Sequence, residues 1–297
     1  MSSAEVAVKI FRKLEPEDFE TLRAVEIQMK KSDFISEELI PRHAKLPNEE
    51  VAYRLDELSK HGLLQHQSTP YVGYRLTAAG YDCLAINALV KADVLQALGK
   101  PLGIGKESDV YDALMPDKTR VAVKFHRLGR PSFRQTKRKR GYTAEQAYTP
   151  TWLYQSRLAA KREFEALSML YPKGVSVPKP IKQNRHVIVM SIIEGAELYY
   201  LEIPDPRKVL DEILLNIKKA YRDAGIIHAD LSPYNIIVQL DEHILIIDWP
   251  QYVTVRHPNA KQLLQRDVQN VLRFFQQKLR LKMYCLEDVL ANIRGIS

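Results

Sequence analysis

The stretch IIHADLSPYN at residues 226–235, followed by ILIIDWP at residues 244–250, is the most informative part of this 297-residue chain. Asp230 precedes the carboxamide of Asn235 by five residues, and a second carboxylate, Asp248, ends the next apolar segment. The apolar residues between them predict a hairpin that returns Asp248 to Asn235. Phosphoryl transfer uses such groups, because one carboxylate orients the attacking hydroxyl while an amide oxygen and another carboxylate hold divalent ions on the phosphates. The spacing predicts a phosphotransferase that uses ATP and Mg²⁺ or Mn²⁺, with Asp230 catalytic and Asn235 and Asp248 as metal ligands.

A loop suited to covering the ATP phosphates lies upstream, where residues 101–111 have the sequence PLGIGKESDVY. Its Gly-x-Gly turn lets backbone N–H groups approach a phosphate closely, and Ser108 stands where a typical protein kinase has a third glycine. A plain hairpin turn would explain the loop equally well if it stood alone. As a phosphate loop it is expected to contribute a run of ATP contacts: Gly103, Gly105, Lys106, Glu107, Ser108 and Val110.

The strand VAVKF at residues 121–125 predicts the lysine that grips the ATP phosphates. Lys124 should be oriented by a glutamate on the following helix. Glu163 is preferred over Glu165 because it lies beside the apolar stripe of that helix, whereas Glu165 points toward solvent. An ordinary solvated charge is the alternative for Glu163. Lys124 therefore joins the two aspartates in the predicted catalytic set.

A buried strand at residues 186–195, HVIVMSIIEG, runs into a glycine and is expected to join two lobes. Adenine would be held there by backbone groups around Ser191 and Ile193, with Met190 beside the pocket. A core methionine on a core strand explains Met190 equally well. These residues complete the predicted ATP-binding set.

Together, GIGKESDVY, VAVK, REFEAL, HADLSPYN and IDWPQ resemble the RIO family of atypical protein kinases, and the N-terminal region resembles its winged-helix-bearing second subfamily. The resemblance implies an α+β, bilobal protein-kinase-like fold, with a small β-rich lobe and a helical lobe. It implies a serine/threonine kinase or ATPase that autophosphorylates and acts in small ribosomal subunit maturation. Trp249 and Pro250 replace the usual Phe-Gly, and no Ala-Pro-Glu segment follows. An ordinary activation loop is therefore doubtful, and Asp248 itself is a candidate for transient phosphorylation.

Four segments are predicted along the chain. Residues 1–82 are expected to form a winged helix-turn-helix domain, residues 83–98 a connecting helix, residues 99–195 the kinase N-lobe, and residues 196–297 the C-lobe. Within these segments, helices are expected to begin at Pro16 and Asn48, a hairpin to form the wing, and a last long helix to span roughly residues 260–281, while His228 is expected to orient the catalytic loop rather than act as a base. The helix from Asn48 to Lys60 would be the groove-reading helix of the winged domain. It carries four acids against Arg54 and Lys60, so base reading is unfavourable. Protein contacts, RNA contacts through Arg75 and the wing, or a purely structural packing role are the remaining expectations for this domain.

The net charge of +8 is concentrated in one part of the chain. Residues 1–98 carry 12 Lys and Arg against 15 Asp and Glu, whereas residues 99–195 carry 19 against 8. Seven cations lie between Arg127 and Arg140, within a basic insert expected to be flexible over residues 126–150. This run is either a solvated loop or a contact for RNA, with pre-small-subunit ribosomal RNA and ribosomal proteins as the implied partners. Ser132 and Thr136 are the predicted autophosphorylation sites.

Composition points to an intracellular, soluble protein. No apolar run approaches the roughly 20 residues that span a bilayer, and the first residues lack the basic and apolar regions of a signal peptide. The two cysteines are far apart and form no metal-binding pair, which suits a reducing cytosol. We therefore expect a cytoplasmic protein that does not contact a membrane.

Two other functions remain open at this level. A small-molecule kinase of the aminoglycoside or choline phosphotransferase type shares the H-x-D-x-x-x-x-N spacing, but it needs neither the basic insert nor the winged helix. A winged-helix nucleic-acid regulator whose kinase lobe only senses ATP is the non-enzymatic alternative. The presence of Lys124, Asp230, Asn235 and Asp248 counts against it, and the Trp249-Pro250 departure counts for it.

Overall fold

The structure, a computed structural model, describes residues 2–128, 152–281 and 284–295. The chain divides into two compact units, each described here by itself. The first comprises residues 1–100, 113–119 and 129–155, and the second comprises residues 101–112, 120–128 and 156–297. The predicted phosphorylation sites Ser132 and Thr136, and the cations from Arg130 to Arg140, lie outside the described residues.

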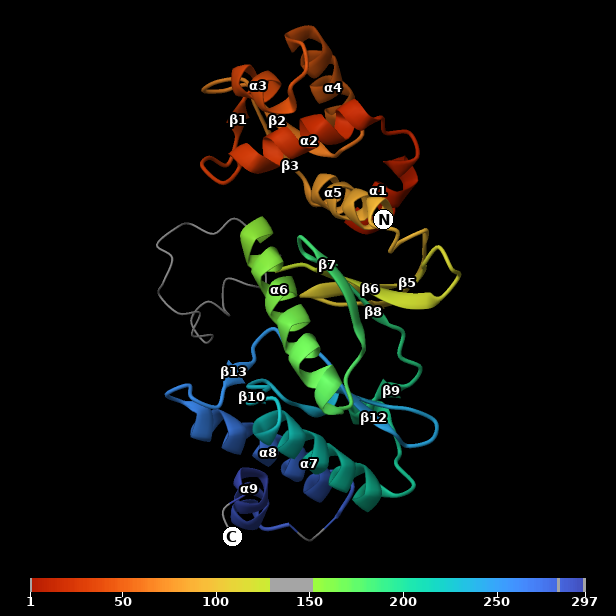
Figure 1. Ribbon diagram of the computed structural model, residues 1–297, viewed down its shortest axis with the longest axis vertical. Helices are drawn as coiled ribbons and strands as arrows, with labels where there is room; N and C mark the ends of the chain where they lie inside the picture. The colour runs from red at the N-terminus through yellow and green to blue at the C-terminus, as the bar shows by residue number, and fades with distance from the viewer. Residues whose placement is uncertain (1, 129–151, 282–283, 296–297) are drawn as a thin grey trace. The chain divides into compact units, whose positions relative to one another are not determined.

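The first unit is dominated by a winged helix-turn-helix domain (Figure 1). Its three-stranded sheet has the order β1-β3-β2, and the hairpin of β2 and β3 forms the wing. The helices and strands of the domain are α1 Ser3–Phe11, α2 Pro16–Gln28, β1 Ile35–Ser36, η1 Glu37–Leu39, α3 Ile40–Ala44, α4 Asn48–Lys60, β2 Leu64–Gln67, β3 Gly73–Leu76 and α5 Ala78–Lys91. The predicted helix starts at Pro16 and Asn48 are confirmed, and so is the hairpin of the wing.

The connecting helix predicted over residues 83–98 is wrong in its bounds. A helix, α5, already begins at Ala78, because the Thr77 hydroxyl accepts a hydrogen bond from the Gly80 N–H at 3.1 Å and caps the helix. It ends at Lys91, and residues 97 and 98 belong to a strand. A side chain at Gly80 would lie 2.2 Å from the Leu63 carbonyl oxygen, so glycine permits this close approach. The helix is thus an integral part of the N-terminal domain.

The sheet of the kinase N-lobe has five strands in the order β4-β5-β6-β8-β7. Strand β6 pairs antiparallel with β8, so that Lys124 lies opposite Ile188 and Ala122 opposite Met190. Figure 1 shows α6, in green, running beside this sheet. The elements are β4 Ala97–Ile104, β5 Ser108–Leu114, β6 Arg120–His126, α6 Trp152–Leu170, η3 Tyr171–Lys173, β7 Pro180–Asn184 and β8 Val187–Ser191.

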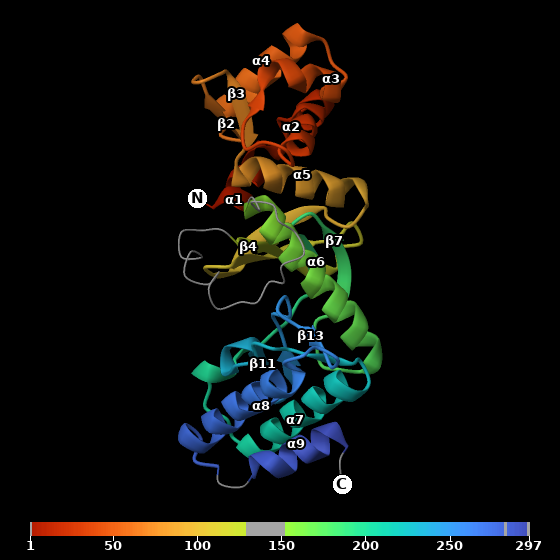
Figure 2. The same ribbon diagram turned by 90° about the vertical axis from the view of Figure 1, so that its left-hand side faces the viewer.

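The C-lobe packs three helices beneath two small sheets (Figure 2). Asp205 caps α7, which ends before Gly225, a glycine with φ of +70°. The strand order of the larger sheet is β12-β11-β9, and β10 pairs with β13. The elements are β9 Ala196–Glu197, η4 Leu198–Tyr200, α7 Pro206–Arg222, β10 Ile226–Ile227, η5 Pro233–Asn235, β11 Ile236–Val238, β12 Ile244–Ile246, β13 Val253–Thr254, α8 Ala260–Gln277 and α9 Leu286–Arg294.

The core of the second unit surrounds the end of the catalytic hairpin. Trp249 and Phe275 are fully buried there, together with the apolar faces of α7 and α8. The predicted final helix over residues 260–281 corresponds to α8, which ends at Gln277, and α9 was not predicted. Among the described residues, no helix combines the length and the apolar character needed to cross a membrane.

Candidate active site

Lys124 and Glu163 form a buried ion pair. The ammonium of Lys124 donates to both carboxylate oxygens of Glu163 at 2.8 Å, and the residues are 6% and 2% exposed. The rival glutamate, Glu165, instead contacts Lys161 at the exposed surface. Burial alone would raise the pKa of Glu163, but the Lys124 charge and the nearby His126 ring outweigh it and lower that pKa. The predicted choice of Glu163 as the partner of Lys124 is confirmed.

The same lysine reaches the end of the catalytic hairpin. Its ammonium donates to Asp248 Oδ1 at 2.9 Å, and the Asp248 side chain is 40% exposed. Burial would lower the pKa of Lys124, but the charges of Asp248 and Glu163 raise it above its ordinary value, which keeps the ammonium protonated. One cation thus contacts both a carboxylate on α6 and the carboxylate of Asp248, and the catalytic roles of these residues stay a prediction.

The hairpin brings Asp248 beside Asn235, as predicted. Strands β11 and β12 pair with Ile236 opposite Ile246, and the Ile247 N–H donates to the Asn235 carbonyl at 2.9 Å. Asp248 has a φ of +66°, an uncommon conformation for a residue with a side chain. Trp249, buried to 1% exposure, donates from Nε1 to the Ile246 carbonyl at 3.1 Å. This indole therefore anchors the backbone on either side of Asp248.

Asp230 is exposed at the tip of the catalytic loop. His228 is buried below it, and its Nε2 lies 3.0 Å from the Ile247 carbonyl, so Nε2 carries the hydrogen. The other ring nitrogen, Nδ1, accepts a hydrogen bond from the Asp230 N–H at 3.3 Å. The prediction that His228 orients the loop rather than acting as a base agrees with these contacts.

The side chains of Asn235 and Asp248 suit a divalent cation. Asn235 donates from Nδ2 to the Asp230 carbonyl at 2.9 Å, which leaves its side-chain oxygen as the acceptor. Asp248 uses Oδ1 for Lys124 and has Oδ2 in addition. Magnesium is commonly held by one or two protein oxygens together with substrate phosphates, so this donor set fits Mg²⁺ bound with ATP.

The predicted phosphate loop connects β4 to β5. Gly103 lies within β4, and the Gly105 N–H donates to the Ser108 carbonyl at 2.8 Å, closing a tight turn. Lys106 is exposed, whereas Glu107 and Ser108 are half-buried. The loop is therefore a strand-to-strand turn, and its contact with phosphate stays a prediction.

The residues predicted around adenine follow β8. Met190 is 7% exposed and belongs to the same apolar core that Val110 packs against. Ser191 is committed to backbone pairing, since its Oγ accepts from the Lys179 N–H at 2.9 Å. Ile193 is half-buried just beyond the strand. Their nucleotide contacts stay a prediction.

The prediction that Arg127 belongs to the run of cations that contacts RNA is wrong, because Arg127 is buried. Its guanidinium is 3% exposed and donates from Nε to Asp109 Oδ2 at 2.8 Å, inside the N-lobe. Its backbone N–H donates to the Glu107 carbonyl at 2.7 Å. A basic run predicts surface charge on average, but an arginine at a strand end can be buried with an aspartate from the next strand. Arg127 is thus hydrogen-bonded to the backbone of the predicted phosphate loop.

Several residues that sequence reasoning missed support the catalytic loop. Asp267 on α8 accepts from the Ala229 N–H at 2.7 Å and the Leu231 N–H at 3.1 Å. Ala229 has a φ of +64°, so the loop is strained where Asp267 holds it. Burial raises the pKa of Asp267 to about 6, although His228 and the two N–H donors oppose the shift. Sequence spacing alone gives no signal for this contact, because 36 residues separate Asp267 from Leu231.

The predicted cations of the winged domain are engaged in ion pairs. Arg54 on α4 contacts Glu15, Asp18 and Glu50 at 2.7–3.4 Å, and Lys60 contacts two acids on its own helix. Arg75 on β3 pairs with Asp33 at 3.0 Å and stacks over Phe34. The two cations of α4 and Arg75 of the wing are thus engaged within the domain, and what this domain contacts stays a prediction.

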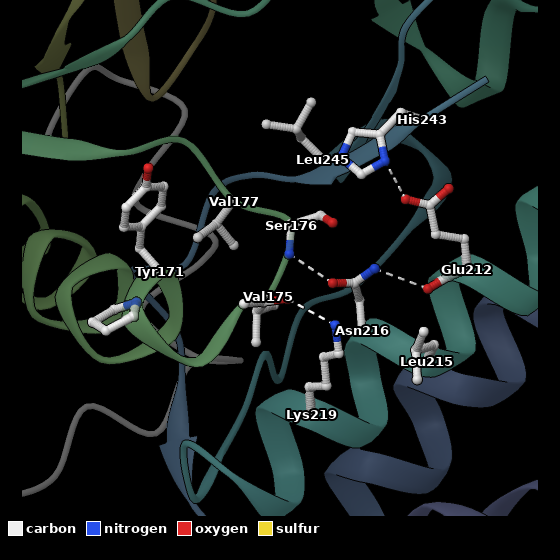
Figure 3. Close-up of a pocket in the computed structure, with 12 residues that line it drawn as sticks. Tyr171, Val175, Ser176, Val177, Glu212, Leu215, Asn216, Lys219, His243 and Leu245 are labelled. Carbon is white, nitrogen blue, oxygen red and sulfur yellow. Dashed lines mark hydrogen bonds and ion pairs between the residues drawn. The ribbon is translucent and has the colours of Figure 1, made fainter. Parts of the chain in front are cut away.

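A hollow of about 630 Å³ lies elsewhere on the second unit (Figure 3). Asn216 on α7 accepts from the Ser176 N–H at 2.6 Å, and Lys219 donates to the Gly174 carbonyl at 2.9 Å. Glu212 contacts His243 at 2.5 Å. Since these polar groups bond to one another across the hollow, they fasten the segment after α6 to the C-lobe. None of the predicted site residues lines it.

A strand lysine that grips a helix glutamate and also reaches the aspartate ending a C-lobe hairpin is the arrangement of protein-kinase-like phosphotransferases. The comparisons with known proteins specify the family. Residues 109–286 match the RIO domain, and residues 11–92 match the Rio2 N-terminal domain. The chain belongs to the RIO kinase family, in its Rio2 branch.

Relatives of this branch cover most of the chain. It is 43% identical over 255 residues to the RIO-type serine/threonine-protein kinase Rio2 of Methanocaldococcus jannaschii, covering 84% of this chain and 92% of that protein. It is 41% identical to the serine/threonine-protein kinase RIO2 of Caenorhabditis elegans, covering 91% of this chain and 51% of that protein. A solved structure of the Rio2 kinase–ADP/Mg²⁺–phosphoaspartate complex from Chaetomium thermophilum superposes with a TM-score of 0.82 at 33% identity, covering 95% of this chain and 87% of that one.

Proposed function

We propose that this RIO-type kinase binds ATP with Mg²⁺ and transfers the γ-phosphoryl group to serine or threonine hydroxyls and, in an ATPase cycle, to its own Asp248. The observation that carries the proposal is the position of the Lys124 ammonium, 2.8 Å from Glu163 and 2.9 Å from Asp248. A lysine held in this way can grip the ATP phosphates beside the metal ligands.

Each residue then has one role in transfer to a hydroxyl. Lys124 holds the α- and β-phosphates, and the oxygens of Asn235 and Asp248 hold the magnesium that neutralises phosphate charge. Asp230 orients the acceptor hydroxyl and takes its proton as the oxygen attacks the γ-phosphorus. The bond from that phosphorus to the bridging oxygen breaks, and ADP leaves. His228 and Asp267 keep the loop in position through the Asp230, Ala229 and Leu231 N–H groups.

Asp248 is the candidate acceptor for the second outcome. Its carboxylate would attack the γ-phosphorus to give an aspartyl phosphate and ADP, and water would later release phosphate. The Chaetomium Rio2 kinase was solved with ADP, Mg²⁺ and phosphoaspartate. In this chain, the 40% exposed side chain of Asp248 and its 2.9 Å contact with Lys124 support this role.

One experiment separates the outcomes. Purified wild type, Asp230→Ala and Asp248→Ala are incubated with γ-labelled ATP and Mg²⁺, with and without small-subunit ribosomal RNA. Label on serine or threonine that is lost in Asp230→Ala supports the kinase role. A base-labile adduct that is lost in Asp248→Ala supports the ATPase cycle. No label and no ATP turnover in wild type would contradict both, and transfer only to a small amine or sugar would favour a small-molecule kinase.

We infer that the biological setting is maturation of the small ribosomal subunit in the cytoplasm, with pre-small-subunit ribosomal RNA and ribosomal proteins as partners. The RIO family resemblance and the 19 cations against 8 acids over residues 99–195 support this setting. Binding to labelled small-subunit RNA should weaken steeply between about 50 and 200 mM salt if phosphate contacts dominate. Salt-independent binding, or none, would contradict it.

A further inference from the structure

Three tyrosines form an aromatic cluster beside the catalytic loop. Tyr199 and Tyr200 come from η4, and Tyr234 comes from η5, two segments far apart in the sequence. The rings of Tyr199 and Tyr234 stack with centroids 4.3 Å apart. Tyr200 meets Tyr199 at 5.2 Å and Tyr234 at 6.1 Å, both edge-on. These three side chains are called the tyrosine platform below.

The platform faces solvent although its rings are large. Tyr199, Tyr200 and Tyr234 are 37%, 72% and 43% exposed. Isolated exposed aromatic residues are common, but contiguous ones usually mark an interaction site, because each ring could otherwise bury apolar area. Tyr199 packs against Phe274 on α8, with ring centroids 6.2 Å apart, and this contact fixes one side of the platform to the core. The platform is therefore a fixed and open surface.

Its location relates it to the reaction. Tyr234 immediately precedes the proposed metal ligand Asn235 and lies four residues after Asp230, on the same short loop. The amide of Asn235 bonds to the Asp230 carbonyl at 2.9 Å, which keeps this loop compact. A polypeptide whose hydroxyl reaches Asp230 would lie close to the loop that carries Tyr234. The tyrosine platform is thus placed to contact residues that flank an acceptor.

The electrostatic surroundings favour a cationic ligand. Glu197 precedes η4 and Glu202 follows it, and residues 194–205 include no lysine or arginine. The ammonium of Lys278 already lies 4.2 Å from the centre of the Tyr199 ring. A cation therefore binds a face of this cluster within the chain itself, as ring quadrupoles allow.

We propose that the tyrosine platform docks arginine or lysine side chains that flank the acceptor in a protein substrate, so that the enzyme selects basic segments. The inference rests on the proposed kinase function and adds its substrate class. Acidic residues around η4 would repel the phosphates of RNA, so a basic polypeptide is the better occupant. The chain's own sequence RPSFRQTKRKR, residues 130–140, has this chemistry around Ser132 and Thr136.

Binding can be tested separately from transfer. The probe is a fluorescein-labelled peptide of residues 128–142 carrying Ser132→Ala and Thr136→Ala, which cannot accept phosphate. Its partner probe has every arginine replaced by neutral citrulline and both lysines, Lys137 and Lys139, replaced by neutral acetyl-lysine. Fluorescence anisotropy with wild-type enzyme, ADP and Mg²⁺ should give a Kd at least fivefold lower for the arginine peptide. Equal affinity for the two peptides would overturn the proposal, even if the enzyme turns over ATP.

Variants then locate the binding site. Tyr200→Ala and Tyr234→Ala should each weaken binding of the arginine peptide about two- to fivefold, the range for one exposed cation–π contact. Tyr200→Phe and Tyr234→Phe keep the ring and should restore binding. The matched control is Tyr171→Ala, which removes another exposed tyrosine, 45% exposed, that lies in η3. If Tyr171→Ala weakens binding as much as Tyr200→Ala, the platform is not the site.

Kinetics and a nucleic-acid probe complete the test. With the unmodified peptide of residues 128–142 as substrate, Tyr200→Ala should raise the KM for peptide more than the KM for ATP. A labelled single-stranded oligouridine replaces the peptide in a parallel titration. Oligouridine binding that falls in Tyr200→Ala while peptide binding does not would overturn the proposal in favour of nucleic acid. Absence of phosphoryl transfer with intact arginine-dependent binding would instead contradict the proposed kinase function alone.

Discussion

Two buried ion pairs involve cations three residues apart, Lys124 on β6 and Arg127 directly after that strand, and the pairs differ in how far they open to solvent. Lys124 pairs with Glu163, and Arg127 pairs with Asp109. Lys124 also contacts Asp248, whose side chain is 40% exposed, so its pair opens toward the proposed nucleotide site. The Arg127 pair is closed, because both of its side chains are at most 3% exposed. Burial and charge alone therefore do not identify a functional pair, whereas a partly exposed third partner does.

The largest expected effect comes from breaking the closed pair. Arg127→Met removes the cation that pairs with the buried Asp109, which should lower the free energy of unfolding by about 3–5 kcal/mol. Urea denaturation followed by circular dichroism measures it. Arg127→Lys keeps the charge and should lose less.

Arg120→Met is the matched control for that experiment. Arg120 is the first residue of β6 and pairs with Asp112 at 3.1 Å, but its side chain is 52% exposed, so its loss should change stability little. If Arg127→Met and Arg120→Met unfold with the same urea midpoint, the Arg127–Asp109 pair has no special stabilising role and the contrast with Lys124 fails.

Breaking the open pair should affect catalysis. Lys124→Met should lower the rate of phosphoryl transfer about 10²–10³-fold, because a preorganised charge at the phosphates is lost. Single-turnover transfer from γ-labelled ATP gives the rate. Arg120→Met should retain wild-type transfer, since Arg120 contacts none of the proposed site residues. A Lys124→Met enzyme with undiminished transfer would remove the functional meaning of the open pair.

The Lys124–Glu163 pair was predicted from the sequence, whereas Arg127 was wrongly assigned to a surface run of cations. Lys124 has a local signature, an apolar alternating strand with one lysine, and helical spacing distinguishes Glu163 from Glu165. The local sequence around Arg127 is misleading, because the burial of Arg127 depends on Asp109, which is 18 positions away on a neighbouring strand. The same limit applies to Asp267, whose partners are loop N–H groups. Backbone hydrogen bonds to a distant side chain leave no periodic trace in a sequence.

Fold boundaries show a similar division. Helix starts marked by proline or acidic residues, such as those at Pro16 and Asn48, were predictable from local chemistry. The start of α5 was missed because its cap, Thr77, directly follows a strand, and the helix was placed too late. The end of α8 and all of α9 depend on packing against α7 and the C-lobe core, which local pattern does not encode.

A third prediction concerns Asp267, whose pKa burial raises from 3.8 to about 6 despite opposing contacts with His228 and Arg266. The folded state then binds the proton more tightly than the unfolded chain does. Protonation of the Asp267 carboxyl therefore stabilises the folded state. This stabilisation is complete below about pH 4 and is lost as the pH rises through about 6. Asp267→Asn cannot titrate.

The unfolding free energy of wild type minus that of Asp267→Asn should therefore fall by about 2–3 kcal/mol between about pH 4 and pH 7. Urea unfolding across this pH range measures the difference, in which shared titrations cancel. A difference that is flat, or that rises with pH, would show that Asp267 is already ionised at low pH in the folded protein.

The smallest effect should come from His126, which lies on β6 between the two ion pairs. Its Nε2 is 3.0 Å from Glu163 Oε2, at an angle poorer than that of a regular hydrogen bond, and the residue is 2% exposed. This ring limits the movement of Glu163 and so positions Lys124 indirectly. His126→Leu should raise the KM for ATP about fivefold, which corresponds to about 1 kcal/mol for one imperfect contact. His126→Gln offers a donor again and should recover most of the wild-type KM in steady-state assays, whereas an equal KM for both variants would mean that His126 only fills space in the core.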